Sequence, residues 1–478
     1  MMNRVLAGIV VVTTSSPSEP KRARLDTKDL DTALGFGVAV ACLATAMTCG
    51  QVPQRPTKTA TAAPSSSSAS KEQAPTFVAP AASAMSAPTE STSTESTPAV
   101  SAPTAATQKS LDGFRTLLMR LHEKQLEQPL RVLWLGDSHT AGVTWPVTVE
   151  QSLLKQVPSG GPGYLPLGLT SQRQHGAKIS SDPSFDIAPH PPAKRSLEDD
   201  GVFGLAGFRA TSHEKSLEVI IKFDTPAAAA DLNCQLLYRY QRPLDRVTVS
   251  FAGKQLEVVE RPGVSFPHGV RLFEFKAPTQ TLLQVKSVRG NPELFGLIAE
   301  TGAPGLVVDV LGINGARFAT PLAWEEETWK ALVAYRHPAL AVVAYGTNEV
   351  FDEVRPARYE SEIIRLLARI RAAVPDVECL LAGPTDVGRG GEVAEQRVSA
   401  IDEMERRVAE QQGCAYFSSY QTMGGASGFS EWLHAAPVLA TPDGVHLTQA
   451  GYRTLGAQLG ELLLNGAQQA APSTANVP

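Results

Sequence analysis

The chain of 478 residues lacks the sequence features on which nucleotide, metal and nucleic-acid chemistry depend. It has no Gly-rich phosphate loop, no Cys-x-x-Cys pair and no His-x-x-x-His spacing, so the sequence predicts no cofactor and no metal site. It also has no excess of basic residues, because 43 Lys and Arg stand against 48 Asp and Glu, giving a net charge of −5. A chain with this charge balance creates no field that attracts nucleic acid. What remains is a globular composition, 43% hydrophobic, in a chain longer than one typical domain.

Cysteines are too few for a disulfide framework, since there are five and the number is odd. Cys379 and Cys414 lie in apolar, strand-like runs and are expected to be buried. Two interpretations of this pair stay open. The residues are buried thiols, or they form one bridge between neighbouring strands in an oxidising compartment.

The first 50 residues carry an apolar stretch, Ala33 to Thr48, behind the basic run Lys21-Arg22-Ala23-Arg24. Its short length and its Ala and Gly content favour a secretory signal over a spanning helix. Cys49 follows Ala46-Met47-Thr48, a loose match to a lipoprotein cleavage site. We therefore expect residues 1–50 to be the signal or anchor of an exported, periplasmic or cell-surface protein. Cleavage, an uncleaved membrane anchor and lipidation at Cys49 all stay open.

Residues 51–109 consist largely of Ala, Ser, Thr and Pro and contain one aromatic residue, Phe77. Such a segment cannot bury enough apolar surface to offset the loss of chain entropy on folding. We predict a disordered linker here and a short disordered tail at 467–478.

The most informative motif follows the apolar run Val132 to Leu135, which ends abruptly in Gly136-Asp137-Ser138. A serine at the carboxyl end of a buried strand, with a helix after it, is where an open α/β sheet presents a reactive group. The alternative is that Ser138 is an ordinary helix N-cap. The prediction therefore depends on the residues downstream.

A base for Ser138 stands near the C-terminus, in Asp443-Gly-Val-His446. A serine hydroxyl needs a base that takes its proton and a third group that holds the base in one tautomer. The spacing lets Asp443 accept from one ring nitrogen of His446 while the other nitrogen faces Ser138. Oxyanion donors are expected from the backbone of Ser138 and Gly315 and from the side chain of Asn348, because the last two follow predicted strands.

Taken in order, Gly-Asp-Ser138, Gly315, Gly-Thr-Asn348-Glu and Asp-Gly-Val-His446 resemble the four blocks of the SGNH (GDSL) hydrolase family. The resemblance covers roughly residues 130–464, apart from an insertion. It implies hydrolysis of an ester through a covalent acyl-serine, without a metal. The third block usually reads Gly-x-Asn-Asp, and Glu349 replaces the acid here. The hydrogen bonding of the loop behind Asn348 is therefore open.

Alternating strands and helices predict a flavodoxin-like, three-layer α/β fold with a parallel sheet, divided between residues 110–195 and 304–466. Strands are expected at 131–135, 306–311, 340–345, 377–382 and 415–418. Helices are expected at 111–125, 145–156, 321–335, 358–374, 392–411 and 447–465.

The interval between the first two of these strands is too long for a loop. It contains short alternating runs at 217–223, 235–240, 246–251, 256–259, 270–275, 282–288 and 294–300. These predict an inserted antiparallel β-sandwich at 196–303.

An exported SGNH hydrolase with such an insertion is similar to the bacterial peptidoglycan O-acetylesterases, whose extra module looks like a carbohydrate-binding domain. The resemblance implies an O-acylated cell-envelope polysaccharide as substrate, with peptidoglycan expected. Aromatic residues of the insertion either stack on sugar or form its core. They are Tyr238, Tyr240, Phe251, Phe266, Phe273 and Phe275. Residues 160–200 are expected to be an irregular cover of the acyl site, with Tyr164, Arg173, His175 and His190.

Further polar residues lie beside the motifs. We expect His139 to wall the site, Asp386 to lie at the ligand edge, and Arg317 either to hold a substrate carboxylate or to pair with Glu349 or Asp352. Two other functions stay open: a lipase or thioesterase of the same fold, and a non-catalytic glycan-binding protein. A long-chain acyl preference would indicate the first, and inactivity despite intact Ser138 the second.

Overall fold

The computed structural model describes residues 111–167, 172–181, 185–187, 200–211, 218–224, 231–260, 263–353 and 355–465. All of them belong to one compact unit, Ser93–Pro478. The predicted signal or anchor at 1–50, the linker at 51–109 and the tail at 467–478 lie outside the described residues. So do Cys49, His190 and the side chain of Arg173.

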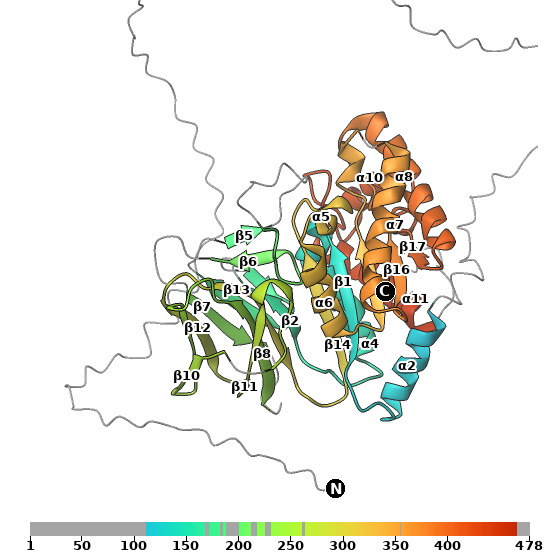
Figure 1. Ribbon diagram of the computed structural model, residues 1–478. Coiled ribbons are helices and arrows are strands. Elements are labelled where there is room, and N and C mark those ends of the chain that lie inside the picture. Colours follow the sequence, from blue (N-terminus) through green and yellow to red (C-terminus); the bar gives the residue numbers. More distant parts are fainter. Residues whose placement is uncertain are drawn as a thin grey trace, which may run out of the picture. The chain divides into compact units, whose positions relative to one another are not determined.

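Five strands form a parallel sheet in the order β14-β1-β15-β16-β17 (Figure 1). Their bounds are Leu306–Gly312 (β14), Leu130–Gly136 (β1), Leu340–Ala344 (β15), Glu378–Ala382 (β16) and Ala415–Phe417 (β17). In chain order this is 2-1-3-4-5, which is the flavodoxin-like arrangement and confirms the predicted fold. Gly136, at the end of β1, is in register with Gly312 on one side and Ala344 on the other, so three strands end at one edge.

Helices cover both faces of this sheet, which explains why its strands are almost wholly apolar. Leu133 and Leu135 of β1 join a core with α6, α7 and α8, whereas Val132 and Trp134 join a core with α2, α4 and α11. The helices are α2 (Asp112–His122), α3 (Ser138–Ala141), α4 (Thr144–Leu153), α5 (Ala319–Leu322), α6 (Glu326–Arg336), α7 (Pro356–Ala373), α8 (Gly391–Gln411), α9 (Ser419–Thr422), α10 (Gly428–His434) and α11 (Gln449–Asn465). The helix predicted at 321–335 is in fact two, α5 and α6.

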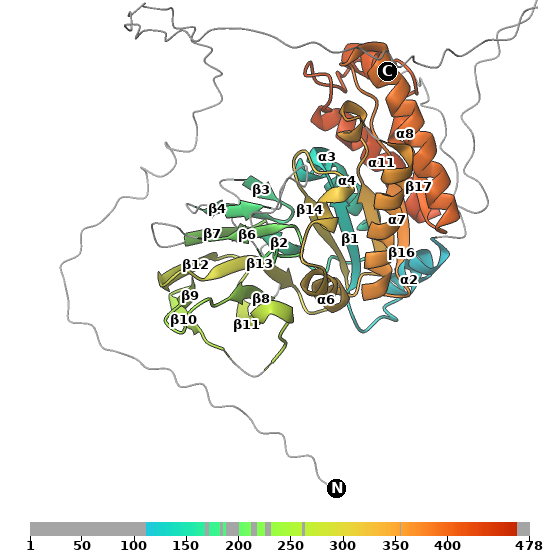
Figure 2. The ribbon, with the colours of Figure 1, turned by 45° about the horizontal axis from the view of Figure 1, so that its top comes forward.

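Two antiparallel sheets are inserted between β1 and β14, with strand orders β10-β9-β12-β7-β4-β3 and β11-β8-β13-β6-β5, and β2 pairs with β13 (Figure 2). The strands are β2 (Gly163–Pro166), β3 (Gln172–Gln174), β4 (Ala177–Ser181), β5 (Phe185–Ile187), β6 (Phe208–Ala210), β7 (Glu218–Phe223), β8 (Leu232–Arg239), β9 (Arg246–Phe251), β10 (Lys254–Val258), β11 (Arg271–Ala277), β12 (Leu282–Arg289) and β13 (Glu293–Glu300). Inward-facing residues of both sheets, such as Val249 and Leu236, share one apolar core, as in a sandwich.

For the described part of residues 160–200 the expectation of an irregular cover is wrong, because four strands lie there and belong to the antiparallel sheets. Residues 168–171, 182–184 and 188–199 lie outside the described residues. Tyr164 is buried, and its hydroxyl donates to the carbonyl of Phe295. His175 is buried against Glu150, with 3.1 Å between Nε2 and the carboxylate. Both side chains therefore belong to the interior and do not wall the acyl site.

The aromatic side chains proposed for sugar stacking are mostly interior. Tyr238, Phe251, Phe273 and Phe275 belong to the sandwich core. Phe266 is also buried, and its ring meets that of Tyr335 edge to face at 5.5 Å. Tyr240 is half-buried, and its hydroxyl donates to the carbonyl of Val258. These aromatic residues therefore stabilise the fold of the insertion.

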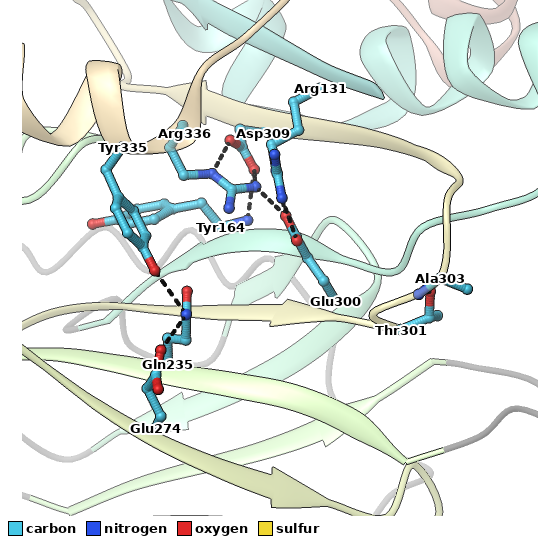
Figure 3. Close-up of polar contacts among 10 residues, drawn as sticks. All are labelled: Arg131, Tyr164, Gln235, Glu274, Glu300, Thr301, Ala303, Asp309, Tyr335 and Arg336. Carbon is cyan, nitrogen blue, oxygen red and sulfur yellow. Dashed lines mark hydrogen bonds and ion pairs between the residues drawn. The ribbon is translucent and has the colours of Figure 1, made fainter. Parts of the chain in front are cut away.

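A buried ion network joins the inserted sheets to the parallel sheet (Figure 3). Arg336 of α6 donates to both carboxylate oxygens of Asp309 in β14, at 2.7 and 3.0 Å, and to Glu300 of β13 at 2.6 Å. Arg131 of β1 makes two further hydrogen bonds to Glu300, and the backbone N–H of Tyr164 donates to Asp309. Burial opposes ionisation of Glu300, but the two arginines outweigh it and lower its pKa to about 2. Glu300 therefore stays charged at neutral pH.

Cys379 and Cys414 form a disulfide, which decides between the two interpretations left open by the sequence. The pairing is close because Cys379 lies in β16 and Cys414 directly precedes β17, the next strand of the sheet. Cys234, which also belongs to the described residues, is a free, buried thiol. In the described part of the chain, no helix combines the length and the apolar character needed to cross a bilayer.

Candidate active site

The turn after β1 presents Ser138 at the edge where the parallel strands end. A Cβ on Gly136 would lie 2.0 Å from the hydroxyl of Thr140 and 2.9 Å from a backbone carbonyl of β15, so only glycine fits this tight turn. Asp137 is the N-cap of α3, since its carboxylate accepts from the backbone N–H of His139 at 2.9 Å. The cap is therefore Asp137, which leaves the hydroxyl of Ser138 available.

Ser138, His446 and Asp443 stand in one hydrogen-bonded row. The ring Nε2 of His446 is 3.0 Å from the Ser138 hydroxyl, and its Nδ1 is 2.7 Å from Oδ2 of Asp443. The other oxygen of Asp443 accepts from the backbone N–H groups of Val445 and His446 and from the hydroxyl of Thr441. Partial burial opposes ionisation, but these hydrogen bonds outweigh it and hold the pKa of Asp443 well below its usual range. The carboxylate is therefore charged, which favours a proton on Nδ1 and a free lone pair on Nε2 toward the serine.

The two expected oxyanion donors lie on loops that flank Ser138. Gly315, after β14, has a φ of +76°, a left-handed conformation that favours glycine. Asn348, after β15, donates from its side-chain amide to the carbonyl of Ala316 at 3.1 Å and to Asp137 at 3.3 Å. The structure thus brings Ser138, Gly315, Asn348 and His446 to the wall of one cavity of about 780 Å³.

Glu349 links the loops after β14 and β15. One carboxylate oxygen accepts from the backbone N–H of Phe318 at 3.0 Å, and the other from that of Gly346 at 3.2 Å. Burial raises the pKa of Glu349 to about 8. The hydrogen bonding that the sequence left open is therefore a bridge between the two loops that carry the expected oxyanion donors.

Arg317 stabilises the loop after β14. The sequence left open whether it holds a substrate carboxylate or pairs with Glu349 or Asp352, and the structure shows that it pairs with Asp352. Its guanidinium contacts both oxygens of Asp352, one at 2.8 Å, and donates to the carbonyl of Gly315 at 2.9 Å. A guanidinium held in this bidentate geometry is committed to the protein. Arg317 therefore positions Gly315.

Residues 281–454 match the model of the GDSL-like Lipase/Acylhydrolase family. This range contains Gly315, Asn348, Asp443 and His446, whereas Ser138 lies upstream of it, across the insertion. A solved structure of a peptidoglycan O-acetylesterase superposes with a TM-score of 0.61 at 22% identity, covering 73% of this chain and 95% of that one. The chain therefore has the fold of an SGNH hydrolase, and its segment 281–454 matches this family. It acts on ester bonds, as its family match indicates.

Two other similar structures are a lipase/acylhydrolase from Enterococcus faecalis and an acetyl xylan esterase. The first has a TM-score of 0.28 at 18% identity, covering 35% of this chain and 80% of that one. The second has a TM-score of 0.26 at 17% identity, covering 33% and 81%. A search of curated proteins finds no match.

His139 of this hydrolase does not line the cavity, contrary to our expectation. The first turn of α3 directs its side chain inward, where Nδ1 lies 2.9 Å from the hydroxyl of Tyr452 and Nε2 lies 3.2 Å from that of Thr385. Burial, reinforced by the nearby His446, lowers the pKa of His139 to about 3. A neutral His139 thus supports Tyr452, which does line the cavity.

Asp386 also lies in the interior. It is buried and accepts from the backbone N–H of Phe429 at 2.8 Å. In the described part of the hydrolase, no cluster of three or more His, Cys, Asp or Glu could hold a metal ion.

The sequence missed two polar residues that line the cavity, Asn314 and Arg389. Asn314 directly precedes Gly315, and Arg389 stands in Gly388-Arg389-Gly390-Gly391, after the fourth strand of the sheet. An arginine surrounded by glycines at the ligand edge was the available signal.

Proposed function

We propose that this hydrolase is an exported serine esterase that removes O-acetyl, or other short acyl, groups from a cell-envelope polysaccharide, with peptidoglycan as the expected polymer. The observation that carries the catalytic part is the row from Ser138 through His446 to Asp443. Contacts of 3.0 and 2.7 Å lie within the reach needed for proton transfer and for fixing the tautomer of the base.

In the first half-reaction, His446 accepts the hydroxyl proton of Ser138 while the serine oxygen attacks the ester carbonyl. The N–H groups of Ser138 and Gly315 and the amide of Asn348 hold the oxyanion that forms. The bond to the sugar oxygen then breaks, and His446 gives its proton to the departing alcohol. The product of this step is an acyl-Ser138.

In the second half-reaction, water attacks the acyl-serine and His446 takes a proton from that water. The oxyanion forms again in the same place, and its collapse releases the acid while His446 returns the proton to Ser138. No group outside these residues and water enters the cycle.

The oxyanion has to compete for the amide of Asn348, which is already engaged. Its contact with Asp137, at 3.3 Å, is longer than that with the carbonyl of Ala316, at 3.1 Å, and is the one that an oxyanion would replace. Burial raises the pKa of Asp137 to about 7, so this carboxyl is partly neutral near pH 7. A neutral Asp137 gives up the amide more readily than a carboxylate does.

Three observations support the polymer and the compartment. The similarity to the peptidoglycan O-acetylesterase extends over 95% of that protein's length and 73% of this chain. The Cys379–Cys414 bridge supports export, because structural disulfides persist in oxidising compartments and are rare in the cytosol. The apolar stretch Ala33 to Thr48 supports the same localisation, with cleavage, anchoring and lipidation at Cys49 as its alternatives.

The proposal is tested by acetate release from O-acetylated peptidoglycan and from O-acetylated xylan, after activity has been established on p-nitrophenyl acetate. We expect release from peptidoglycan that disappears in Ser138→Ala. Activity that survives this substitution would remove Ser138 from the mechanism, and a preference for xylan would overturn the choice of polymer. Butyryl and octanoyl esters complete the assay, since a preference for long chains would contradict a deacetylase.

A further inference from the structure

Arg389 is an exposed cation at the active-site cavity, and no described carboxylate forms an ion pair with it. It lines the same cavity as Ser138, Asn348 and His446. Within the ranges that the structure describes, no carboxylate and no hydrogen-bond acceptor contacts its guanidinium. Arg317, by contrast, is fully committed to Asp352 and Gly315. Arg389 is thus the arginine of this cavity that is available to a substrate.

The side chain of Arg389 is held in place although it forms no ion pair. Its guanidinium lies over the ring of Phe351, 4.7 Å from the ring centre, and Phe351 is only three residues beyond the oxyanion donor Asn348. Its backbone packs on the other side against Gly444, where an added Cβ would lie 2.9 Å from Cβ of Arg389. The backbone N–H of Gly388 also donates to the carbonyl of Gly444 at 2.9 Å. Stacking and packing therefore orient the guanidinium before a substrate binds.

The charge of the cavity has one sign. Its ionisable lining residues are Arg389, His446 and Tyr452, and within the described residues no carboxylate lines it. Asp443 is exposed next to His446, but its carboxylate is bonded to the ring Nδ1 at 2.7 Å and does not line the cavity. A negative group on the substrate would therefore meet the cation of Arg389 and no carboxylate in the described lining of the cavity.

The position of Arg389 sets where on the substrate this negative group would lie. Ser138 follows β1 and Arg389 follows β16, which are separated by β15 alone. Both residues line one cavity of about 780 Å³, so the negative group would lie close to the acyl group on the substrate.

We propose that Arg389 is a specificity-determining residue that binds a carboxylate carried by the acylated sugar, so that the hydrolase favours acidic over neutral O-acylated sugars. In peptidoglycan this selects muramic acid units whose lactyl carboxyl is not linked to a stem peptide. This inference rests on the proposed esterase function and adds the substrate class. Arginine suits the role, because its planar guanidinium donates two parallel hydrogen bonds to a carboxylate.

The test compares two probes of nearly equal size, 6-O-acetyl-N-acetylmuramic acid and its methylamide, which differ in whether the lactyl carboxyl is charged. For the parent hydrolase we expect kcat/KM to be about tenfold higher for the acid, as for a partly exposed charge-assisted contact. Arg389→Gln should bring the ratio of the two kcat/KM values close to one, and Arg389→Lys should give an intermediate ratio. The matched control is Arg406→Gln, on the exposed far part of α8, which should leave the ratio unchanged.

A measurement on the parent protein alone complements the variants. Raising the salt to about 1 M shortens the screening length to about 3 Å and should reduce the preference for the acid. A ratio near one in the parent, or a ratio that persists in Arg389→Gln, would overturn the role of Arg389 while leaving the esterase intact. If neither probe nor p-nitrophenyl acetate shows turnover that depends on Ser138, the proposed function itself fails.

Discussion

Replacing Asn348 with alanine separates its role in the reaction from its role in the fold. The side-chain amide donates to Ala316 and to Asp137, a carboxyl that is only 1% exposed. At about 1 kcal/mol for each hydrogen bond, with an added cost for a buried acceptor left unpaired, Asn348→Ala should lower the free energy of unfolding by about 1 to 3 kcal/mol. The hydrolase should therefore remain folded at 25 °C.

The effect on turnover should be far larger. An oxyanion donor acts only when charge develops on the carbonyl oxygen, and its loss typically costs about a hundred- to a thousandfold in kcat. KM should change little, because the ester carbonyl of the ground state does not need this donor. The assay is steady-state hydrolysis of p-nitrophenyl acetate, with urea unfolding measured on the same preparation.

The matched control is Asn465→Ala at the exposed end of α11, which makes the same chemical change away from the cavity. It should keep kcat within about twofold and unfolding within about 0.5 kcal/mol of the parent. A kcat of Asn348→Ala within about threefold of the parent, or a loss carried by KM alone, would refute the donor assignment.

Three further predictions concern the fold. Arg336→Met leaves Asp309 buried without its cation and should lower the free energy of unfolding in urea by about 3 to 5 kcal/mol. The double variant Arg336→Met with Asp309→Asn should recover most of this loss. A loss in the double variant equal to the sum of the two single losses would contradict the pairing. Replacing Cys379 and Cys414 with alanine opens a 35-residue loop and should cost about 2 to 4 kcal/mol; an unchanged urea midpoint would count against the bridge. Because burial raises the pKa of Glu349 to about 8, its stabilising contribution is complete below about pH 4.5 and is lost as pH rises through 8. Glu349→Gln should therefore gain stability relative to the parent between pH 5 and 9, and a constant difference would show that Glu349 does not titrate in this range.

The candidate site was largely predictable because its residues follow strand ends in chain order. Parallel strands meet at one edge, so an apolar run that ends in Gly-Asp-Ser138 and a later one that ends near Asn348 had to come together there. Asp443 precedes His446 by three residues, so the two side chains meet within one local turn. A contact of this kind can be predicted from sequence spacing alone.

The direction of individual side chains was not predictable in the same way. His139 is next to Ser138 in sequence, yet one step along α3 turns it into the interior toward Tyr452. The cysteine pairing required the neighbour order of β16 and β17, which periodicity does not encode. Arg389 was missed because a loop residue carries no periodic signal, and its role depends on Phe351 beside it.

Strands β2 to β5 were missed because they are short and interspersed with Gly, Pro and polar residues. β2 has the sequence Gly-Tyr-Leu-Pro and is buried throughout, so it shows no alternation. Its partner β13 lies more than a hundred residues later in the chain. Pairing over such a separation is fixed by tertiary packing, which local propensity does not describe.

Labelling with a fluorophosphonate and mapping the adduct by peptide mass spectrometry tests the catalytic row most directly. The reagent reacts with a serine that has both a base to deprotonate it and an oxyanion hole to hold the phosphoryl oxygen. We expect one adduct per chain, on the peptide that contains Ser138, and its loss in His446→Ala. An adduct on another residue, or labelling of Ser138 that persists without His446, would contradict the mechanism.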